Sequence, residues 1–171
     1  MDGSRTSHDI ALALPLHVDE GEVRRYEVTL PWLPPSKNVY DRWPPGWQAG
    51  HKAKWIRRIV EQCEALDMPR GVPRIGLAAK LVFPTRRKIR DPQNYAATLW
   101  NFVPDALEDR QHGTWGKDRI PLYGYGLIPD DRDGRIEWGP NHGLRFAFDE
   151  RAGVAKAHRQ RTRIYIAVRM G

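Results

Sequence analysis

The segment R-R-K-I-R-D-P-Q-N-Y, residues 86–95, lies where the repeat of apolar residues changes its period. Apolar residues alternate with others before it and predict a half-buried strand: Ile75, Leu77, Ala79, Leu81 and Phe83. Apolar residues after it recur at helical spacing: Tyr95, Leu99, Phe102, Val103 and Ala106. A basic loop therefore connects a strand to a helix that begins around Asp91 and Pro92.

Asp91 has two interpretations. Aspartate followed by proline is a common helix start, because the carboxylate accepts hydrogen bonds from free backbone N–H groups and proline has a helical backbone angle. Four cations precede it in the same loop: Arg86, Arg87, Lys88 and Arg90. Cations beside an acid also suit a site that binds a phosphate and a metal ion together. The residues alone leave both interpretations open.

A magnesium site at Asp91 needs a second acidic group, since Mg²⁺ takes six oxygen ligands. Asp105 lies on the same face of the predicted helix but roughly 21 Å further along, unless Pro104 breaks the helix. The pair Asp130 and Asp131, after a glycine-rich loop, is the better candidate. An ordinary turn rich in Asp and Gly, residues 130–134, is the alternative for this pair.

The segment Y-E-V-T-L-P-W-L-P-P-S-K-N, residues 26–38, resembles the first strand and Pro-Ser-x-Asn loop of the RusA-like Holliday junction resolvases. The later motifs of that family follow in the same order over residues 23–138: the basic loop, Asp91-Pro92-Gln93-Asn94, Asp105-Ala106-Leu107, and Gly126-Leu127-Ile128-Pro129-Asp130-Asp131. Two residues depart from the family pattern. Gln93 replaces its usual second aspartate, and Ala97 stands where many members have a lysine.

This resemblance implies an α+β fold, with a mixed sheet of four to five strands and two main helices. It implies a homodimer that cuts branched double-stranded DNA with Mg²⁺, or with Mn²⁺. The implied catalytic and metal-binding acids are Asp91, Asp131 and Asp130, and side-chain oxygens of Gln93 or Asn94 would help to hold the metal. Residues expected to contact DNA are Arg86, Arg87, Lys88, Arg90, Lys37, Asn38, Lys54 and Arg58.

Composition agrees with a nucleic-acid partner. The 171 residues carry a formal charge of +7, which favours a polyanionic partner. The single cysteine excludes an internal disulfide and indicates a reducing, cytoplasmic compartment. No apolar run approaches the ~20 residues of a membrane span. We expect a flexible lead over residues 1–20 and a single domain over 21–171.

Other elements follow from local patterns. We expect a strand over 22–30, a loop without regular structure over 31–46, and a helix over 49–66 with cations on one face. That face is either solvated or directed toward DNA. Residues 111–126 are predicted to form a long loop, and strands are predicted over 135–138, 144–148 and 162–168. The six histidines lack the spacing of a zinc site.

The residues together with the resemblance to RusA-like resolvases predict a metal-dependent endonuclease that resolves four-way DNA junctions in recombination and repair. The alternative is a DNA-binding protein on the same scaffold, in which Gln93 and Ala97 have removed or weakened catalysis.

Overall fold

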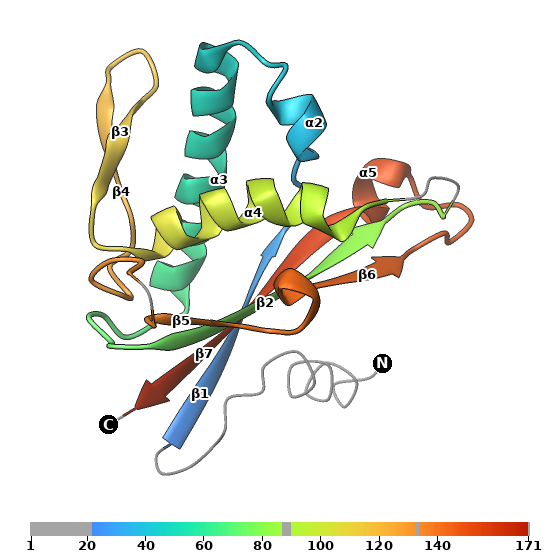
Figure 1. Cartoon of the computed structure of the whole chain (residues 1–171). Coiled ribbons are helices and arrows are strands. Elements are labelled where there is room, and N and C mark those ends of the chain that lie inside the picture. Colours follow the sequence, from blue (N-terminus) through green and yellow to red (C-terminus); the bar gives the residue numbers. More distant parts are fainter. Residues whose placement is uncertain (1–21, 87–89, 133, 171) are drawn as a thin grey trace. The chain divides into compact units, whose positions relative to one another are not determined.

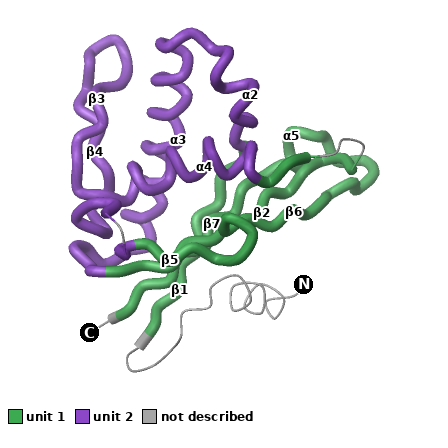
Figure 2. Tube along the Cα trace, viewed as in Figure 1, with its two compact units in different colours: residues 1–33, 74–92, 136–171 green, residues 34–73, 93–135 purple. Residues whose placement is uncertain are grey.

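The computed structural model describes residues 22–86, 90–132 and 134–170, so the predicted lead over residues 1–20 lies outside the described part. The described residues form two compact units, drawn in different colours in Figure 2. Unit 1 contains residues up to 33, residues 74–92 and residues from 136 onward. Unit 2 contains residues 34–73 and 93–135. The single domain over 21–171 stays a prediction.

Unit 1 is a five-stranded mixed sheet (Figure 1). Its strands are β1 (Glu22–Leu30), β2 (Ile75–Phe83), β5 (Ile136–Trp138), β6 (Leu144–Phe148) and β7 (Arg161–Met170). The order is β1-β7-β2-β5, and β6 also pairs with β2. β7 is antiparallel to β1 and β2, whereas β5 and β6 are parallel to β2. With the two long helices of unit 2, the sheet confirms the predicted α+β class.

The central strand β2 is more buried than its sequence predicts. Every residue of β2 is buried except the half-buried Lys80. A strand paired along both edges and covered on both faces has no solvent-facing side. The residues between the larger apolar ones are mostly small, such as Gly76 and Ala78, and they are buried as well. The prediction of a half-buried strand was therefore wrong.

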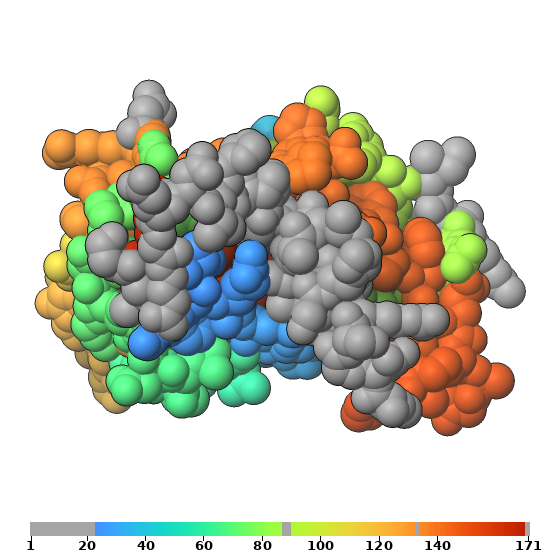
Figure 3. Space-filling model, turned by 90° about the horizontal axis from the view of Figure 1, so that it is seen from below, coloured from blue at the N-terminus to red at the C-terminus, as the bar shows by residue number. Residues whose placement is uncertain are grey.

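Strand β1 pairs with β7 residue by residue, from Glu22 opposite Met170 to Leu30 opposite Thr162. Part of β1, in blue, is visible on the face shown in Figure 3. Arg24 and Arg25 are exposed on this strand, and charged side chains of this kind discourage pairing with further strands at a sheet edge.

An arginine-rich network around Asp149 stabilises the end of the sheet where β2 and β6 finish. The Asp149 side chain is 8% exposed. It accepts two hydrogen bonds of 2.8 Å from Arg151 and one of 3.0 Å from Arg161. Arg159 donates to the backbone oxygens of Asp149 and Pro84, at 2.9 Å each. A charge-assisted network therefore connects the segment after β6 with the start of β7 and the end of β2.

Unit 2 contains the two long helices, α3 (Pro45–Ala65) and α4 (Pro92–Leu107), of which α4 begins in unit 1. The prediction that residues 31–46 lack regular structure was wrong, because α2 (Lys37–Tyr40) forms inside this segment. The Ser36 side chain accepts from the backbone N–H of Val39 and caps α2. α3 begins at Pro45, since proline is favoured in the first turn of a helix.

Aromatic rings hold α2, α3 and α4 together. Phe102 of α4 lies 5.5 Å from the ring of Tyr40, 5.9 Å from His51 and 5.6 Å from Trp55. The ring of Trp43 packs edge-on against His51, at 5.0 Å between centroids. Tilted and edge-to-face pairs at these distances are favourable beyond the area that they bury.

Residues 111–126 are not the predicted loop. They contain the antiparallel hairpin of β3 (Gln111–Trp115) and β4 (Ile120–Tyr123), drawn in yellow and orange in Figure 1. Four residues connect the strands and include Gly116 with φ +77°. The segment has little apolar alternation, so its hairpin character was missed. In the described part of the chain, no helix has the length and apolar character needed to span a membrane.

Replacing Asp149 with asparagine should lower the melting temperature at neutral pH, because the network loses its charged acceptor. The hydrogen bonds from Arg151, and then those from Arg161, hold the pKa of Asp149 well below its usual value. The stabilisation is therefore complete above the unfolded pKa of about 3.9 and is lost as the pH falls below it. Melting curves of both proteins across the acid range should converge. A difference in melting temperature that does not shrink in acid would contradict this account.

Candidate metal centre

Helix α4 continues through Pro104 to Leu107. Pro104 therefore does not break α4, although a proline inside a helix can do so. Asp105 lies in the last turn, and Glu108 follows the last helical residue and donates its backbone N–H to the Pro104 oxygen at 3.0 Å. Residues three apart at a helix end lie on the same side, so the side chains of Asp105 and Glu108 share one face.

The segment from Gly124 to Ile128 runs alongside residues 106–110. The Tyr125 N–H donates to Ala106, the Ile128 N–H to Leu107, and Gly124 donates to Arg110, at 2.7, 3.2 and 2.9 Å. Glu108 and Ile128 also form an isolated parallel bridge. A side chain on Gly124 would meet the backbone oxygens of Glu108 and Asp105, at 2.1 and 2.7 Å from the added Cβ. Only glycine allows this approach of the two backbones.

His112 reaches the same place from the first part of β3. The pairing of β3 with β4 shifts register between Gln111 and Thr114, and Gly113 in this irregular stretch has φ +70°. Irregular positions of this kind redirect side chains in a strand. The His112 side chain is 11% exposed and lies between the two acids.

The three side chains form a compact group. His112 Nε2 lies 3.1 Å from Glu108 Oε1, and His112 Nδ1 lies 3.6 Å from Asp105 Oδ2. One ligand atom from each residue lies within 4.8 Å of the other two. One ion can bind only one of the two ring nitrogens, and two ligands with bonds of about 2.1 Å are separated by at most about 4.2 Å, so the side chains would have to move for all three to bind one ion.

Burial distinguishes this group from an ordinary surface cluster. The Glu108 side chain is 4% exposed, and its polar contact is with His112. Nε2 of His112 is itself buried and makes no hydrogen bond within the described residues. Buried polar groups are normally paired, so a buried Nε2 without a hydrogen bond beside the Glu108 carboxylate is unusual. The site therefore fits an additional electrophile between them, either a proton or a metal ion.

Electrostatics favours a cation at this position. Burial raises the pKa of Glu108, and the charges of Asp131 and Asp105 raise it further. Burial lowers the pKa of His112, which keeps the imidazole neutral and able to ligate a metal. Lys52 of α3 forms an ion pair with Asp105 and supplies one positive charge at the edge of the group.

The two acids of the predicted pair, Asp130 and Asp131, have different surroundings. Asp130 accepts from the Arg135 guanidinium at 2.7 Å and from the Arg132 backbone N–H at 3.2 Å. Partial burial opposes the shift, but these hydrogen bonds hold the pKa of Asp130 below its usual value. These contacts suit an ordinary turn, but the charge of Asp130 also raises the pKa of Glu108, and a role of Asp130 in metal binding stays a prediction. Asp131 is exposed and makes no ion pair with a described residue.

The other predicted metal ligands lie at the far end of α4 or before it. Gln93 and Asn94 are in the first turn, and Asn94 is about 21 Å from Glu108 at ~1.5 Å per residue. Gln93 and Asn94 therefore lie far from Glu108, and far from the acids whose charges raise its pKa. Asp91 directly precedes α4 and belongs to unit 1, whereas Asp131 belongs to unit 2. A shared ion between Asp91 and Asp131 stays a prediction.

Predicted DNA contacts in the basic loop make interactions within unit 1. Arg86 pairs with Glu150 at 3.2 Å. Arg90 lies 4.0 Å above the Phe83 ring and donates to the Thr85 oxygen. Arg87 and Lys88 lie outside the described residues.

Predicted DNA contacts in unit 2 are on the surface. Lys37 and Asn38 are exposed on α2, where Lys37 pairs with Asp41. Lys54 and Arg58 are exposed on α3, where Arg58 lies 3.6 Å from Glu61. Their contact with DNA stays a prediction.

Sequence reasoning missed Glu108 and His112. The spacing Asp105-x-x-Glu108-x-x-x-His112 was a usable signal, since i, i+3 and i+7 share a face of a helix. The helix ends before Glu108, however, and His112 arrives through the hairpin. A histidine spacing test aimed at zinc sites would not find a group with a single histidine.

Comparisons with known proteins give no independent family assignment. No protein-family model matches the chain, and no curated protein matches it in sequence.

Replacing Gly124 with alanine should destabilise the protein by about 1–3 kcal/mol, the usual cost of forcing extra atoms into a packed region. The added methyl group would collide with the backbone of Glu108 and Asp105. Gly50→Ala is the matched control, because nothing lies within 4 Å of its added Cβ and alanine favours the helix by about 0.8–1.0 kcal/mol. Urea unfolding should give opposite signs for the two variants. Equal effects would contradict the close approach at Gly124.

A saturating concentration of Mn²⁺ should raise the melting temperature, since a ligand at about 100 times its Kd adds about 2.7 kcal/mol to the free energy of unfolding. The rise should be lost in Glu108→Gln and in His112→Gln, and retained in the exposed control Glu64→Gln. The neutral glutamine should be tolerated because the folded state already disfavours the charge of Glu108. An equal rise in Glu108→Gln would remove this residue from the metal site.

Proposed function

We propose that the chain is a metal-dependent nuclease that hydrolyses phosphodiester bonds in branched DNA. The observation that carries the proposal is the group of Asp105, Glu108 and His112, with the charge of Asp131 close enough to act on Glu108. The formal charge of +7 and the resemblance to RusA-like resolvases support a DNA substrate.

Asp105, Glu108 and His112 would hold the metal ion. A bound divalent ion would polarise the scissile phosphate and lower the pKa of a water molecule. Because one ligand is an imidazole nitrogen, the site suits a transition-metal ion such as Mn²⁺ better than Mg²⁺, which prefers oxygen ligands. We therefore propose Mn²⁺ as the more effective ion.

Neighbouring side chains would position the substrate. Lys52 already pairs with Asp105 and carries a charge that attracts phosphate to the edge of the site. Asp131 is exposed, so it can accept a hydrogen bond from a water molecule beside the phosphate. The resemblance assigns Asp91 to the metal site as well, which makes Asp91 the informative comparison in a cleavage test.

The proposal predicts metal-dependent nicks in an end-labelled four-way junction, at paired positions if the protein acts as a homodimer. Glu108→Gln should reduce the cleavage rate by about 100-fold or more, since removal of a metal ligand impairs both binding and activation. Asp131→Asn should also reduce the rate, and Glu64→Gln should not. Junction binding in EDTA should persist in all three variants, because phosphate contacts carry most of the affinity.

Two outcomes would contradict this assignment. Full cleavage by Glu108→Gln together with loss of cleavage in Asp91→Asn would place the catalytic metal at Asp91, as the resemblance to RusA-like resolvases implies. Shifted but uncut junction with every metal tested would favour the DNA-binding protein without catalysis.

A further inference from the structure

The first half of α3 borders two hollows that share Gly46, Gly50 and Lys54. The first, of about 540 Å³, is also lined by Trp43, Trp47 and His51. The second, of about 470 Å³, lies between α3 and the β3–β4 hairpin and reaches Arg57 and Trp115. Both volumes fall within the about 300–1,000 Å³ that small-ligand sites occupy. We refer to the two hollows together as the α3 groove.

Trp47 is the most exposed large hydrophobic side chain in the α3 groove. It is 68% exposed, and no described ring packs against it. Its neighbours Trp43 and His51 belong instead to the aromatic packing of α2, α3 and α4. Trp47 therefore contributes little to the core, although an exposed tryptophan offers a large flat surface for stacking.

Two glycines leave the helix backbone open beside Trp47. Glycine within a helix is less favourable than alanine, yet nothing lies within 4 Å of a Cβ placed on Gly46 or Gly50. The packing of unit 2 therefore gives no reason for either glycine. A ligand that approaches the helix backbone closely would give one.

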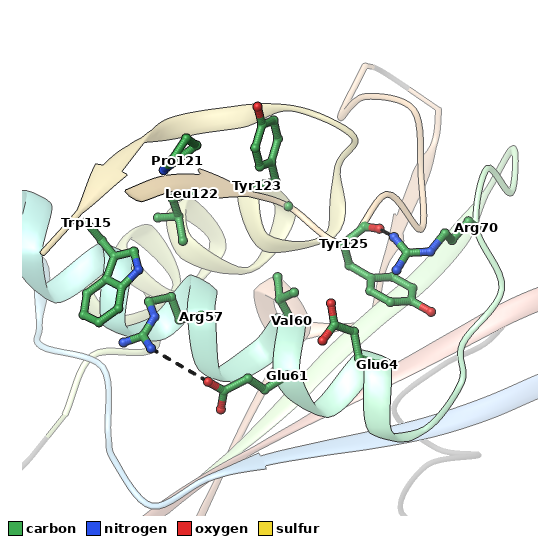
Figure 4. A pocket seen from close by; sticks show the side chains of 11 residues that line it. Arg57, Val60, Glu61, Glu64, Arg70, Trp115, Pro121, Leu122, Tyr123 and Tyr125 are labelled. Atoms are coloured by element: carbon green, nitrogen blue, oxygen red, sulfur yellow. Dashed lines mark hydrogen bonds and ion pairs between the residues drawn. The ribbon is translucent and has the colours of Figure 1, made fainter. Parts of the chain in front are cut away.

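The charges of the groove suit an anion. Neither hollow is lined by an aspartate or a glutamate, and both are bordered by Lys54. At the far end the Arg57 guanidinium lies 3.3 Å from the ring centroid of Trp115 and 4.0 Å from Glu61. Figure 4 shows the three side chains and the ion pair between Arg57 and Glu61. Beyond them the next hollow is lined by Glu61 and Glu64 as well as by Arg57 and Arg70, so it has no excess of positive charge to attract a phosphate. The groove suitable for an anion therefore ends at Arg57 and Trp115.

We infer that the α3 groove binds an unpaired stretch of nucleic acid, with one base stacked on Trp47 and the backbone directed along Lys54 toward Arg57. This inference deepens the proposed nuclease function by naming the part of the substrate that is recognised outside the metal site. Unpaired bases are required because the base faces inside a duplex are covered by neighbouring base pairs. Aromatic residues beside a positively charged groove are the usual means of binding single strands.

The test measures binding of a labelled oligothymidylate by fluorescence anisotropy in EDTA, so that cleavage plays no part. Trp47→Ala should weaken binding about tenfold, the usual loss when one stacking partner is removed. Trp47→Phe should recover part of the affinity. Trp138→Ala is the control, because Trp138 is also exposed, at 44%, but lies on β5 of unit 1.

A second variant tests the groove without removing an aromatic ring. Gly50→Glu places a bulky anion in the groove at a position with open space, so the helix should fold at least as well. Ala65→Glu adds the same charge to an exposed position at the end of α3 that borders neither hollow. Gly50→Glu should weaken binding about tenfold more than Ala65→Glu. Melting curves confirm that each variant is folded.

Three results would overturn the inference. Trp47→Ala and Gly50→Glu could bind as well as their controls, which would leave the groove to a protein partner. A duplex of the same length could bind equally well and independently of Trp47. Thymidine monophosphate could bind as tightly as the oligonucleotide, which would indicate a site for a free nucleotide. Each result concerns binding without metal, so failure here is separate from failure of metal-dependent cleavage.

Discussion

The close approach of two backbone segments at Gly124 determines what the end of α4 can do. Hydrogen bonds connect residues 124–128 with residues 106–110, and Gly124 has no room for a side chain. This contact brings the turn that carries Asp131 near enough to Glu108 to raise its pKa. Without it, the acids of α4 and those of the later turn would be separate surface groups.

A buried carboxylate beside other acids is unfavourable unless something compensates its charge. Around Glu108, the charge of Arg110 opposes the rise of its pKa, but burial and the neighbouring acids outweigh it. Lys52 pairs with Asp105 instead, and burial keeps His112 neutral, so neither neutralises Glu108. Asp149 in unit 1 shows the opposite arrangement, since arginines satisfy its carboxylate directly. The contrast explains why Asp149 is a structural acid and why Glu108 is the candidate for binding an ion.

The strands and helices with a clear repeat of apolar residues could be predicted from the sequence. β1, β2, α4 and β7 were predicted close to their observed positions. The β3–β4 hairpin was missed because its residues are mostly exposed and therefore carry little apolar alternation. The burial of both faces of β2 was also missed, since the local alternation of residues does not show what packs on each face of a strand.

The candidate site was less predictable than the fold. Asp131 was predicted as a site residue, whereas Asp105 was set aside as too far from Asp91. Their relation to Glu108 depends on a helix that continues through Pro104 and on the contact at Gly124. His112 depends on an irregular position in a hairpin that was not expected. Local patterns do not encode such contacts, because they join residues that are distant in sequence.

The central claim is that a metal ion binds at the end of α4. The most direct measurement is a crystal structure of the protein with Mn²⁺, in which anomalous scattering locates the ion. The account predicts a peak within bonding distance, about 2.0–2.3 Å, of side-chain atoms of Asp105, Glu108 and His112. A peak at Asp91 with no density beside Glu108 would contradict it.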